Sequence, residues 1–422
     1  MDECRLVKPE LAMLKKREVS LWIATVAVLI LSYIVFYAIA LRPASDVSIH
    51  ATWASEGNFL NPRTFFKHVA HPLWHGMVAV LLAAGVPLAV SAALVTALLK
   101  ASEVWLLIRL SAKLLGRGGW LATVCGLIAG LVMAVWVPWV NPTVYLGAGS
   151  PNTWHNPTQI IAIVFMLVCV PMTAHCVEVF QRRLPEQGKK ANVDGRYALL
   201  LSALLLVSLM AKPTFLQAFV PAACLYFLVL WIRKPHNTAF IGRMMLVAAP
   251  AVLMMLRQYI FYFCRGTPGQ SIMVLQISWD KAAEVGVYTL LTRLFPLFAL
   301  FACANRDIWR KPLYGLVLLM DVVSILEMLL LGESGARASD GNFGWAMMGS
   351  SLMLWAITLP LYLKRVTAWF SRRRAAASGQ PYLEDKPRAE AARCIGGGVL
   401  LLWHVASGVG YIIYLLTTTA TL

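Results

Sequence analysis

Charged residues are scarce in this chain of 422 residues. Asp, Glu, Lys and Arg together make up 14% of it, whereas 59% of the residues are hydrophobic, and the mean hydropathy is +0.69. Soluble globular domains carry about 25% charged residues. The composition therefore excludes a soluble globular protein and predicts a polytopic integral membrane protein.

Acidic residues are the rarer of the two charges. There are 20 Asp and Glu against 37 Lys and Arg, which gives a formal net charge of +17. Such an excess can indicate nucleic-acid binding, but the basic residues stand in short blocks between apolar runs, where the positive-inside rule accounts for them. We therefore expect no nucleic-acid partner.

Metal and disulfide spacings are also lacking. Five of the eight cysteines lie in apolar runs, where a thiol packs as a small hydrophobic group: Cys125, Cys169, Cys176, Cys224 and Cys303. No Asn-X-Ser/Thr sequon with X other than Pro occurs, which is compatible with a bacterial inner membrane.

Apolar windows close to 20 residues, the length of a membrane-spanning helix, recur along the whole chain. They predict about eleven transmembrane helices in a single domain over 1–422, with the N-terminus inside, the C-terminus outside and no sizeable soluble domain. The windows are 19–41, 74–98, 119–140, 158–180, 196–211, 214–232, 240–263, 285–304, 312–332, 344–363 and 394–416.

The segment 102–117 is shorter and carries Arg109 and Lys113 at helical spacing. This pattern predicts an amphipathic helix on the inner surface. If the segment spans the membrane instead, every later segment changes side.

The distribution of positive charge agrees with this layout. About 28 of the 37 basic residues fall in the inner segments, most visibly in the basic loop 364–393. The outer loops are rich in Trp, His, Asn, Gly and Pro instead, and we expect them to form the functional site: 42–73, 141–157, 264–284 and 333–343.

The first outer loop contains "SDVSIHATWASE". Asp46 and His50 are four residues apart and would share one face of a helix, with Glu56 further along. A carboxylate at the membrane surface can act as a general base toward a hydroxyl, and an imidazole can orient its partner. The alternative is that Ser45 or Asp46 merely caps a short helix.

The second outer loop contains "GAGSPNTWHNPT", in which glycines and prolines favour a stiff turn. An indole beside amide and imidazole groups suits recognition of a sugar or a phosphate, so we take Asn152, Trp154, His155 and Asn156 as substrate-binding candidates. Trp154 could equally be an interfacial anchor, and His155 could serve the loop by hydrogen bonding.

Lys212 in "MAKPTF" stands at an outer turn between two helices. There it could meet a lipid-linked phosphate at headgroup depth, or it could be a snorkelling lysine that positions the two helices. In "GESGARASDGNFG", Glu333 and Arg337 could form a surface ion pair; alternatively Arg337 binds a phosphate while Asp340 or Asn342 contacts a sugar hydroxyl.

Two further patterns stay open. Arg257, Arg293, Asp321 and Glu327 lie inside predicted spans, where charges either pair with one another or line an ion path. His71 and His75 in "HPLWHG" could belong to a divalent metal site, although a packed or headgroup-facing histidine pair is the simpler interpretation. No cofactor is firmly implied.

Together, "SDVSIHATWASE", "HPLWHGMV", "GSPNTWHNPT", "KPTF" and "ESGARASDGNFGW" resemble bacterial polytopic membrane proteins of the GT-C glycosyltransferase class. The resemblance is spread over nearly the whole chain. It implies a polyprenyl-phosphate sugar donor, work at the extracytoplasmic face, Asp46 as the catalytic base with Glu56 in reserve, and Lys212, Arg337 and His155 as candidates for the lipid phosphate.

The sequence thus favours a bacterial inner-membrane glycosyltransferase that acts on a lipid-linked sugar donor and on a glycan, lipid or protein acceptor of the cell envelope, in contact with membrane lipids. Two other classes remain possible. One is a transporter or flippase of lipid-linked sugars, and the other is a non-catalytic membrane scaffold.

Overall fold

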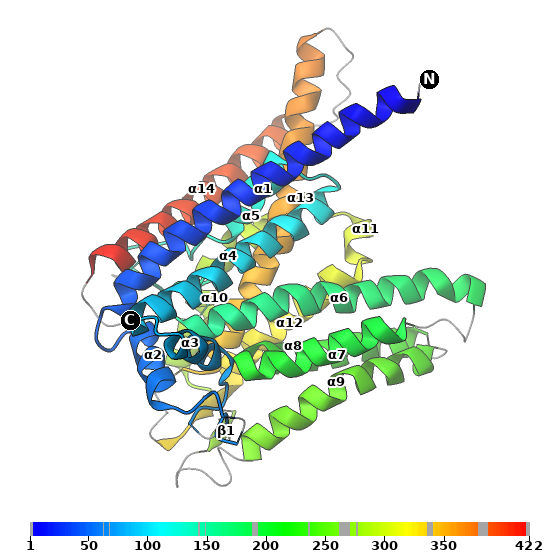
Figure 1. The fold of residues 1–422 in the computed structure, drawn as a ribbon. Helices are drawn as coiled ribbons and strands as arrows, with labels where there is room; N and C mark the ends of the chain where they lie inside the picture. Colours follow the sequence, from blue (N-terminus) through cyan, green and yellow to red (C-terminus); the bar gives the residue numbers. More distant parts are fainter. Residues whose placement is uncertain are drawn as a thin grey trace.

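The computed structural model shows a bundle of long helices with almost no sheet (Figure 1). It describes residues 3–61, 63–66, 68–141, 144–147, 149–187, 193–234, 237–260, 271–275, 277–335, 341–378 and 387–418. Within these residues nine helices are long and apolar enough to cross a membrane, and three shorter helices are apolar. The predicted all-helical integral membrane protein is therefore confirmed.

The nine long helices make up most of the bundle. They are α1 (Glu3–Ala40), α4 (Leu88–Leu115), α6 (Pro157–Gln187), α8 (Thr214–Arg233), α9 (Thr238–Tyr259), α10 (Trp279–Cys303), α12 (Pro312–Leu330), α13 (Gly344–Ala377) and α14 (Pro387–Thr417). The remaining helices are α2 (Asp46–Glu56), α3 (Leu73–Ala83), α5 (Trp120–Ala129), α7 (Gly195–Ala211) and α11 (Arg306–Trp309).

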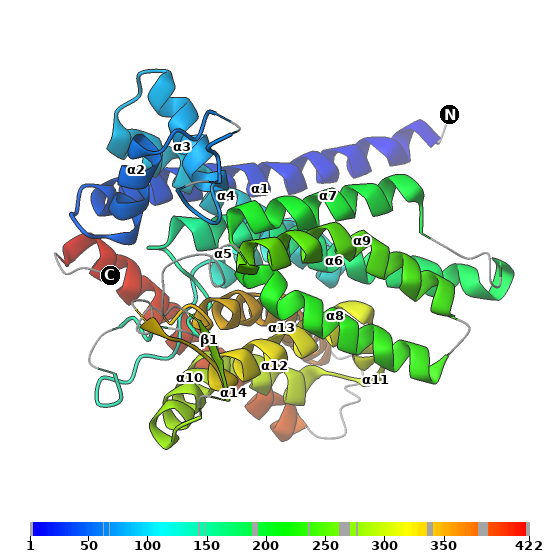
Figure 2. The same cartoon turned by 90° about the horizontal axis from the view of Figure 1, so that it is seen from below.

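Helices α1 and α4 are antiparallel neighbours, and they define the two ends of the bundle. Phe36 packs in one apolar cluster with Ala92, whereas Glu18 approaches Arg109 to 3.5 Å. The end where α1 finishes and α2 begins is called the Asp46 end below. The opposite end, where α4 and α13 finish, is called the basic end. Figure 2 shows α2 and α3 at one end of α1 and the N-terminus at the other.

The predicted span 74–98 and the predicted surface helix 102–117 are both wrong. The chain turns after α3, with Gly85 in the left-handed region at φ 82°, and α4 then runs unbroken through residues 88–115. Gly116, at φ 69°, ends α4 as a left-handed C-cap. Because α4 runs in the direction expected for the predicted span, the later segments keep their relative sides.

The predicted span 119–140 is also wrong, because helix α5 ends after ten residues at Ala129. Residues 132–135 are buried and have no regular secondary structure, and backbone groups of this segment bond to neighbouring helices. The Met133 N–H donates to the His404 carbonyl (3.3 Å), the Trp136 N–H to the Ser407 hydroxyl (3.0 Å) and the Val135 N–H to the Leu291 carbonyl (3.0 Å). Irregular backbone is tolerated at this depth where protein satisfies it.

Two smaller departures complete the fold. The predicted inner loop 364–393 is largely helical, because α13 continues to Ala377 and α14 starts at Pro387. Near the Asp46 end, β1 (Ile272–Val274) pairs antiparallel with β2 (Leu331–Glu333), with Ile272 opposite Glu333.

Candidate active site

Asp46 is the first residue of α2, and its carboxylate is not used to cap that helix. Ser45 is the N-cap, because its hydroxyl accepts the Ser48 N–H at 3.2 Å. The Asp46 side chain is 29% exposed, and its Oδ2 accepts a hydrogen bond from Asn156 Nδ2 at 2.8 Å. Of the two residues that could cap this helix, Ser45 does so, and the Asp46 carboxylate bonds to Asn156 instead.

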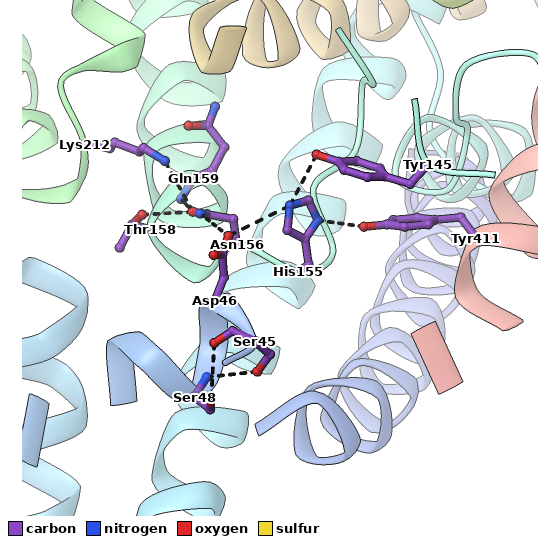
Figure 3. Close-up of polar contacts among 10 residues, drawn as sticks. All are labelled: Ser45, Asp46, Ser48, Tyr145, His155, Asn156, Thr158, Gln159, Lys212 and Tyr411. Atoms are coloured by element: carbon purple, nitrogen blue, oxygen red, sulfur yellow. Dashed lines mark hydrogen bonds and ion pairs between the residues drawn. The ribbon is translucent and has the colours of Figure 1, made fainter. Parts of the chain in front are cut away.

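Asn156 joins the candidate base to the candidate cation (Figure 3). Its Oδ1 accepts from the Gln159 N–H (2.9 Å), the Thr158 hydroxyl (2.9 Å) and Lys212 Nζ (3.4 Å). Asn156 thus caps α6, whose first residue is the favourable Pro157. With its oxygen engaged by these donors, the amide must turn its NH₂ toward Asp46.

His155 lies beside Asp46 but is held by two tyrosines. Its Nδ1 is 2.7 Å from the Tyr411 hydroxyl and its Nε2 is 3.3 Å from the Tyr145 hydroxyl, while Asp46 Oδ2 is 4.0 Å from Nε2. Burial lowers the pKa of His155 to about 4, although Asp46 opposes that shift. The imidazole is therefore neutral near pH 7 and supplies no positive charge for a phosphate.

Lys212 follows the last residue of α7, and its ammonium lies 3.8 Å from the centre of the Trp345 ring. The residue is only 7% exposed. Gln159 fixes this arrangement, since its Nε2 donates to the Trp345 carbonyl (3.0 Å) and its Oε1 accepts from the Thr214 hydroxyl (3.0 Å). A buried cation therefore stands next to Asp46, at the same end of the bundle.

A cavity of about 480 Å³ adjoins this cluster, and Tyr145 and Trp345 form part of its wall. The wall mixes aromatic, amide and charged groups, among them Tyr288, Lys281, Glu284 and Asn342. Cavities of this size and character suit small polar ligands held by a few oriented groups. The cluster and the cavity together are called the Asp46 site.

Two predicted residues of the first loop lie apart from this cluster. Glu56 is the exposed last residue of α2, about 15 Å along the helix from Asp46 at the usual rise per residue. His50 is buried, with its Nδ1 3.0 Å from His75 Nε2. Burial and then the neighbouring His75, His71 and Lys212 hold the pKa of His50 well below its usual range.

Asn152 and Trp154 are buried in the bundle, and their ligand contact stays a prediction. Asn152 is fully buried: its Nδ2 donates to the carbonyls of Ala129 and Val132, where α5 ends, and its Oδ1 accepts from Lys100. Trp154 is 3% exposed and stacks on Phe36, and its ring centre lies 4.7 Å from Lys100 Nζ. Neither side chain lines the cavity, and the same holds for Asp46, His155, Asn156 and Lys212, which adjoin it through Tyr145 and Trp345.

The late outer loop is only partly described. Arg337 and Asp340 lie outside the described residues. Asn342 lines the cavity of the Asp46 site, and its Nδ2 donates to Glu333 Oε2 at 2.6 Å. Asn342 therefore remains a candidate ligand contact. The ion pair predicted between Glu333 and Arg337 lies outside the described residues on the Arg337 side.

The histidines do not assemble a recognisable metal centre. His50, His71 and His75 lie near one another, with ring centroids 5.1 to 6.5 Å apart. Even so, among the described residues no group of three or more His, Cys, Asp or Glu side chains could hold a metal ion. His71 and His75 lie with their ring centroids 6.5 Å apart, and the divalent metal site stays an untested possibility.

The intramembrane charges do not form one path. Arg293 is paired with Asp321 by two hydrogen bonds of 2.8 and 2.6 Å, deep in the bundle. Arg257 is exposed and lies beside Phe66, and the buried Glu327 Oε2 has no hydrogen-bond partner among the described residues. None of these four side chains lines the cavity of the Asp46 site.

Sequence reasoning missed Tyr145, Trp345, Tyr411 and Gln159. Tyr411 lies inside a predicted span, and only its bond to His155 reveals its role. Asn156 and Gln159 carried a detectable signal, since an N-cap asparagine, a proline and a glutamine at the third helical position make a capping pattern.

No protein-family model matches the chain, and no curated protein matches it in sequence. Two solved structures of ArnT from Cupriavidus metallidurans, one bound to undecaprenyl phosphate and one in the apo state, are similar in structure. Each has 13% identity and a TM-score of 0.45, and the match covers 93% of this chain and 76% of ArnT. ArnT is a GT-C glycosyltransferase, the class that the sequence motifs resemble. At this identity and TM-score, function has to be argued from the chemistry of the Asp46 site.

Proposed function

We propose that this protein is a membrane glycosyltransferase of the GT-C type. It moves a sugar from a polyprenyl-phosphate donor to a hydroxyl of a cell-envelope glycan, lipid or protein. One observation carries the proposal: the Asp46 carboxylate and the Lys212 ammonium are bridged by the Asn156 amide at one end of the bundle, beside a cavity of about 480 Å³.

Asp46 is the group that would take the acceptor's proton. Asn156 engages its Oδ2, and Oδ1 has no hydrogen-bond partner among the described residues. A partly exposed carboxylate held by one rigid donor is positioned to act as a general base while one oxygen stays available. Its place in the first turn of a helix also favours a negative group there.

Lys212 is the group that would stabilise the leaving phosphate. The acceptor hydroxyl loses its proton to Asp46 Oδ1 while its oxygen bonds to the anomeric carbon. The bond from that carbon to the donor's phosphate oxygen breaks, and the phosphate leaves with the electron pair. A leaving group that is already an anion needs a cation rather than a proton donor, and the buried Lys212 supplies one.

The neutral His155 and the aromatic wall would position the sugar. Tyr145 and Trp345 contact His155 on one side and line the cavity on the other, so they can hold a sugar ring close to Asp46. The concentration of Lys and Arg in segments at the basic end supports placing the Asp46 site on the extracytoplasmic side of a bacterial inner membrane.

The test compares two acids of the same helix. Asp46→Asn should lower transfer at least about 100-fold, the usual contribution of a general base. Glu56→Gln makes the same chemical change at the exposed far end of α2 and should leave transfer unchanged. Purified variants are assayed against a panel of polyprenyl-phosphate sugars, with mass spectrometry of the products. Full activity in a folded Asp46→Asn variant would refute the mechanism.

A further inference from the structure

A second cavity lies at the basic end, away from the Asp46 site. It has a volume of about 540 Å³ and is formed by the last turn of α4, the second half of α6, the turn between α11 and α12, and the start of α12. Four cations from these segments converge on it: Lys113, Arg182, Arg310 and Lys311. The Asp46 mechanism uses none of them.

The charge around this cavity is mostly uncompensated. Glu178 is the one carboxylate of its lining, and it lies 3.7 Å from Arg182. The side chains of Lys113, Arg310 and Lys311 make no hydrogen bond or ion pair with any residue that the structure describes. Cations gathered without a partner repel one another, so an anion placed among them would be stabilised.

Apart from Gln181 and Tyr314, the rest of the lining is apolar. Leu114, Pro171 and Leu313 belong to the membrane-spanning helices and form the wall beside the cations. A small soluble anion would use only the charged part of such a cavity. A lipid would use both, with its phosphate among the cations and the start of its acyl chains along the apolar wall.

We infer that this cavity binds the phosphate headgroup of an anionic membrane lipid. Basic pockets between transmembrane helices are suited to acidic headgroups, because the cations meet the phosphate where the bilayer already presents it. Arg182 and Arg310 can donate two parallel hydrogen bonds to phosphate oxygens, and the lysines add point charges. The site is separate from the donor's phosphate position at Lys212.

The test measures lipid binding to the purified full-length protein in detergent. Phosphatidylglycerol is titrated and followed by native mass spectrometry and by the shift in melting temperature, with phosphatidylcholine and inorganic phosphate as the comparison ligands. The variant Arg310→Gln/Lys311→Gln should bind phosphatidylglycerol about 30-fold more weakly, at about 1 kcal/mol for each charge removed.

The matched control is Lys364→Gln/Arg374→Gln. It removes two exposed charges from α13 toward the same end of the bundle but away from the cavity, and it should change binding less than threefold. If both double variants bound phosphatidylglycerol equally more weakly, the proposed site would be overturned, because the lipid would then be attracted by the net positive charge of this end rather than by the cavity. Equal binding of phosphatidylglycerol and phosphatidylcholine would overturn the assignment of an anionic headgroup. Stabilisation by inorganic phosphate, but not by phosphatidylglycerol, would overturn the assignment of a lipid ligand.

Discussion

The buried pair of Arg293 and Asp321 offers a measurement that separates a structural contact from a functional pair of charges. The pair joins α10 to α12 through two parallel hydrogen bonds, and the Ser350 hydroxyl donates a third to Asp321 Oδ1 at 3.1 Å. Both residues are almost inaccessible, at 1% and 6% exposure. We therefore interpret the pair as a fixed structural contact.

Asp321→Asn should be strongly destabilising, because it leaves the Arg293 guanidinium buried without its counter-ion. Breaking a buried pair from one side costs about 3–5 kcal/mol. The double variant Arg293→Met/Asp321→Leu removes both charges and should regain most of that free energy, since apolar replacement of a buried pair is often neutral. Glu327→Gln in the same helix is the matched control and should cost under about 1 kcal/mol, because its buried Oε2 has no partner among the described residues.

The assay pairs denaturant unfolding in detergent with glycosyl transfer by the same samples. The double variant should be near the wild type in both. A double variant that is as stable as the wild type but inactive in glycosyl transfer would show that the two charges are needed for transfer and are more than a structural contact. A loss below about 1 kcal/mol in Asp321→Asn would refute the reasoning from burial.

Two further outcomes follow from the Asp46 site. Lys212→Met should lower kcat/KM for the lipid-linked donor about 10–100-fold, the value of a charged hydrogen bond to the phosphate, and Lys212→Arg should recover part of it; an unchanged kcat/KM in Lys212→Met would contradict the role of this cation. Burial lowers the pKa of His155 to about 4 in the folded protein, whereas the imidazole of the unfolded chain has a pKa near 6.5. Between these two pH values only the unfolded chain binds the proton. The free energy of unfolding should therefore fall by up to about 3 kcal/mol as the pH drops from 6.5 to 4. His155→Gln should remove that part of the pH dependence in melting experiments on the two proteins, and identical profiles would contradict the burial of this imidazole.

The sequence by itself determined the class of protein, most of the long helices and the end of the bundle at which the polar motifs gather. Hydropathy suffices for these features because a lipid-facing helix needs about 20 apolar residues. The helices predicted at 158–180 and 214–232 are confirmed within a few residues as parts of α6 and α8. Asp46, Asn156 and Lys212 also come together, as three outer-loop candidates should.

The tertiary structure decided which of these candidates face one another. Asn152 and Asn156 belong to the same quoted motif, yet one secures the end of α5 inside the core while the other caps α6 beside Asp46. The end of the helix at Ala129 could not be predicted either, because hydropathy averages over a window and cannot distinguish a buried irregular segment from a helix. In irregular backbone, side-chain direction depends on hydrogen bonds to distant residues such as His404 and Tyr411, and no local pattern contains them.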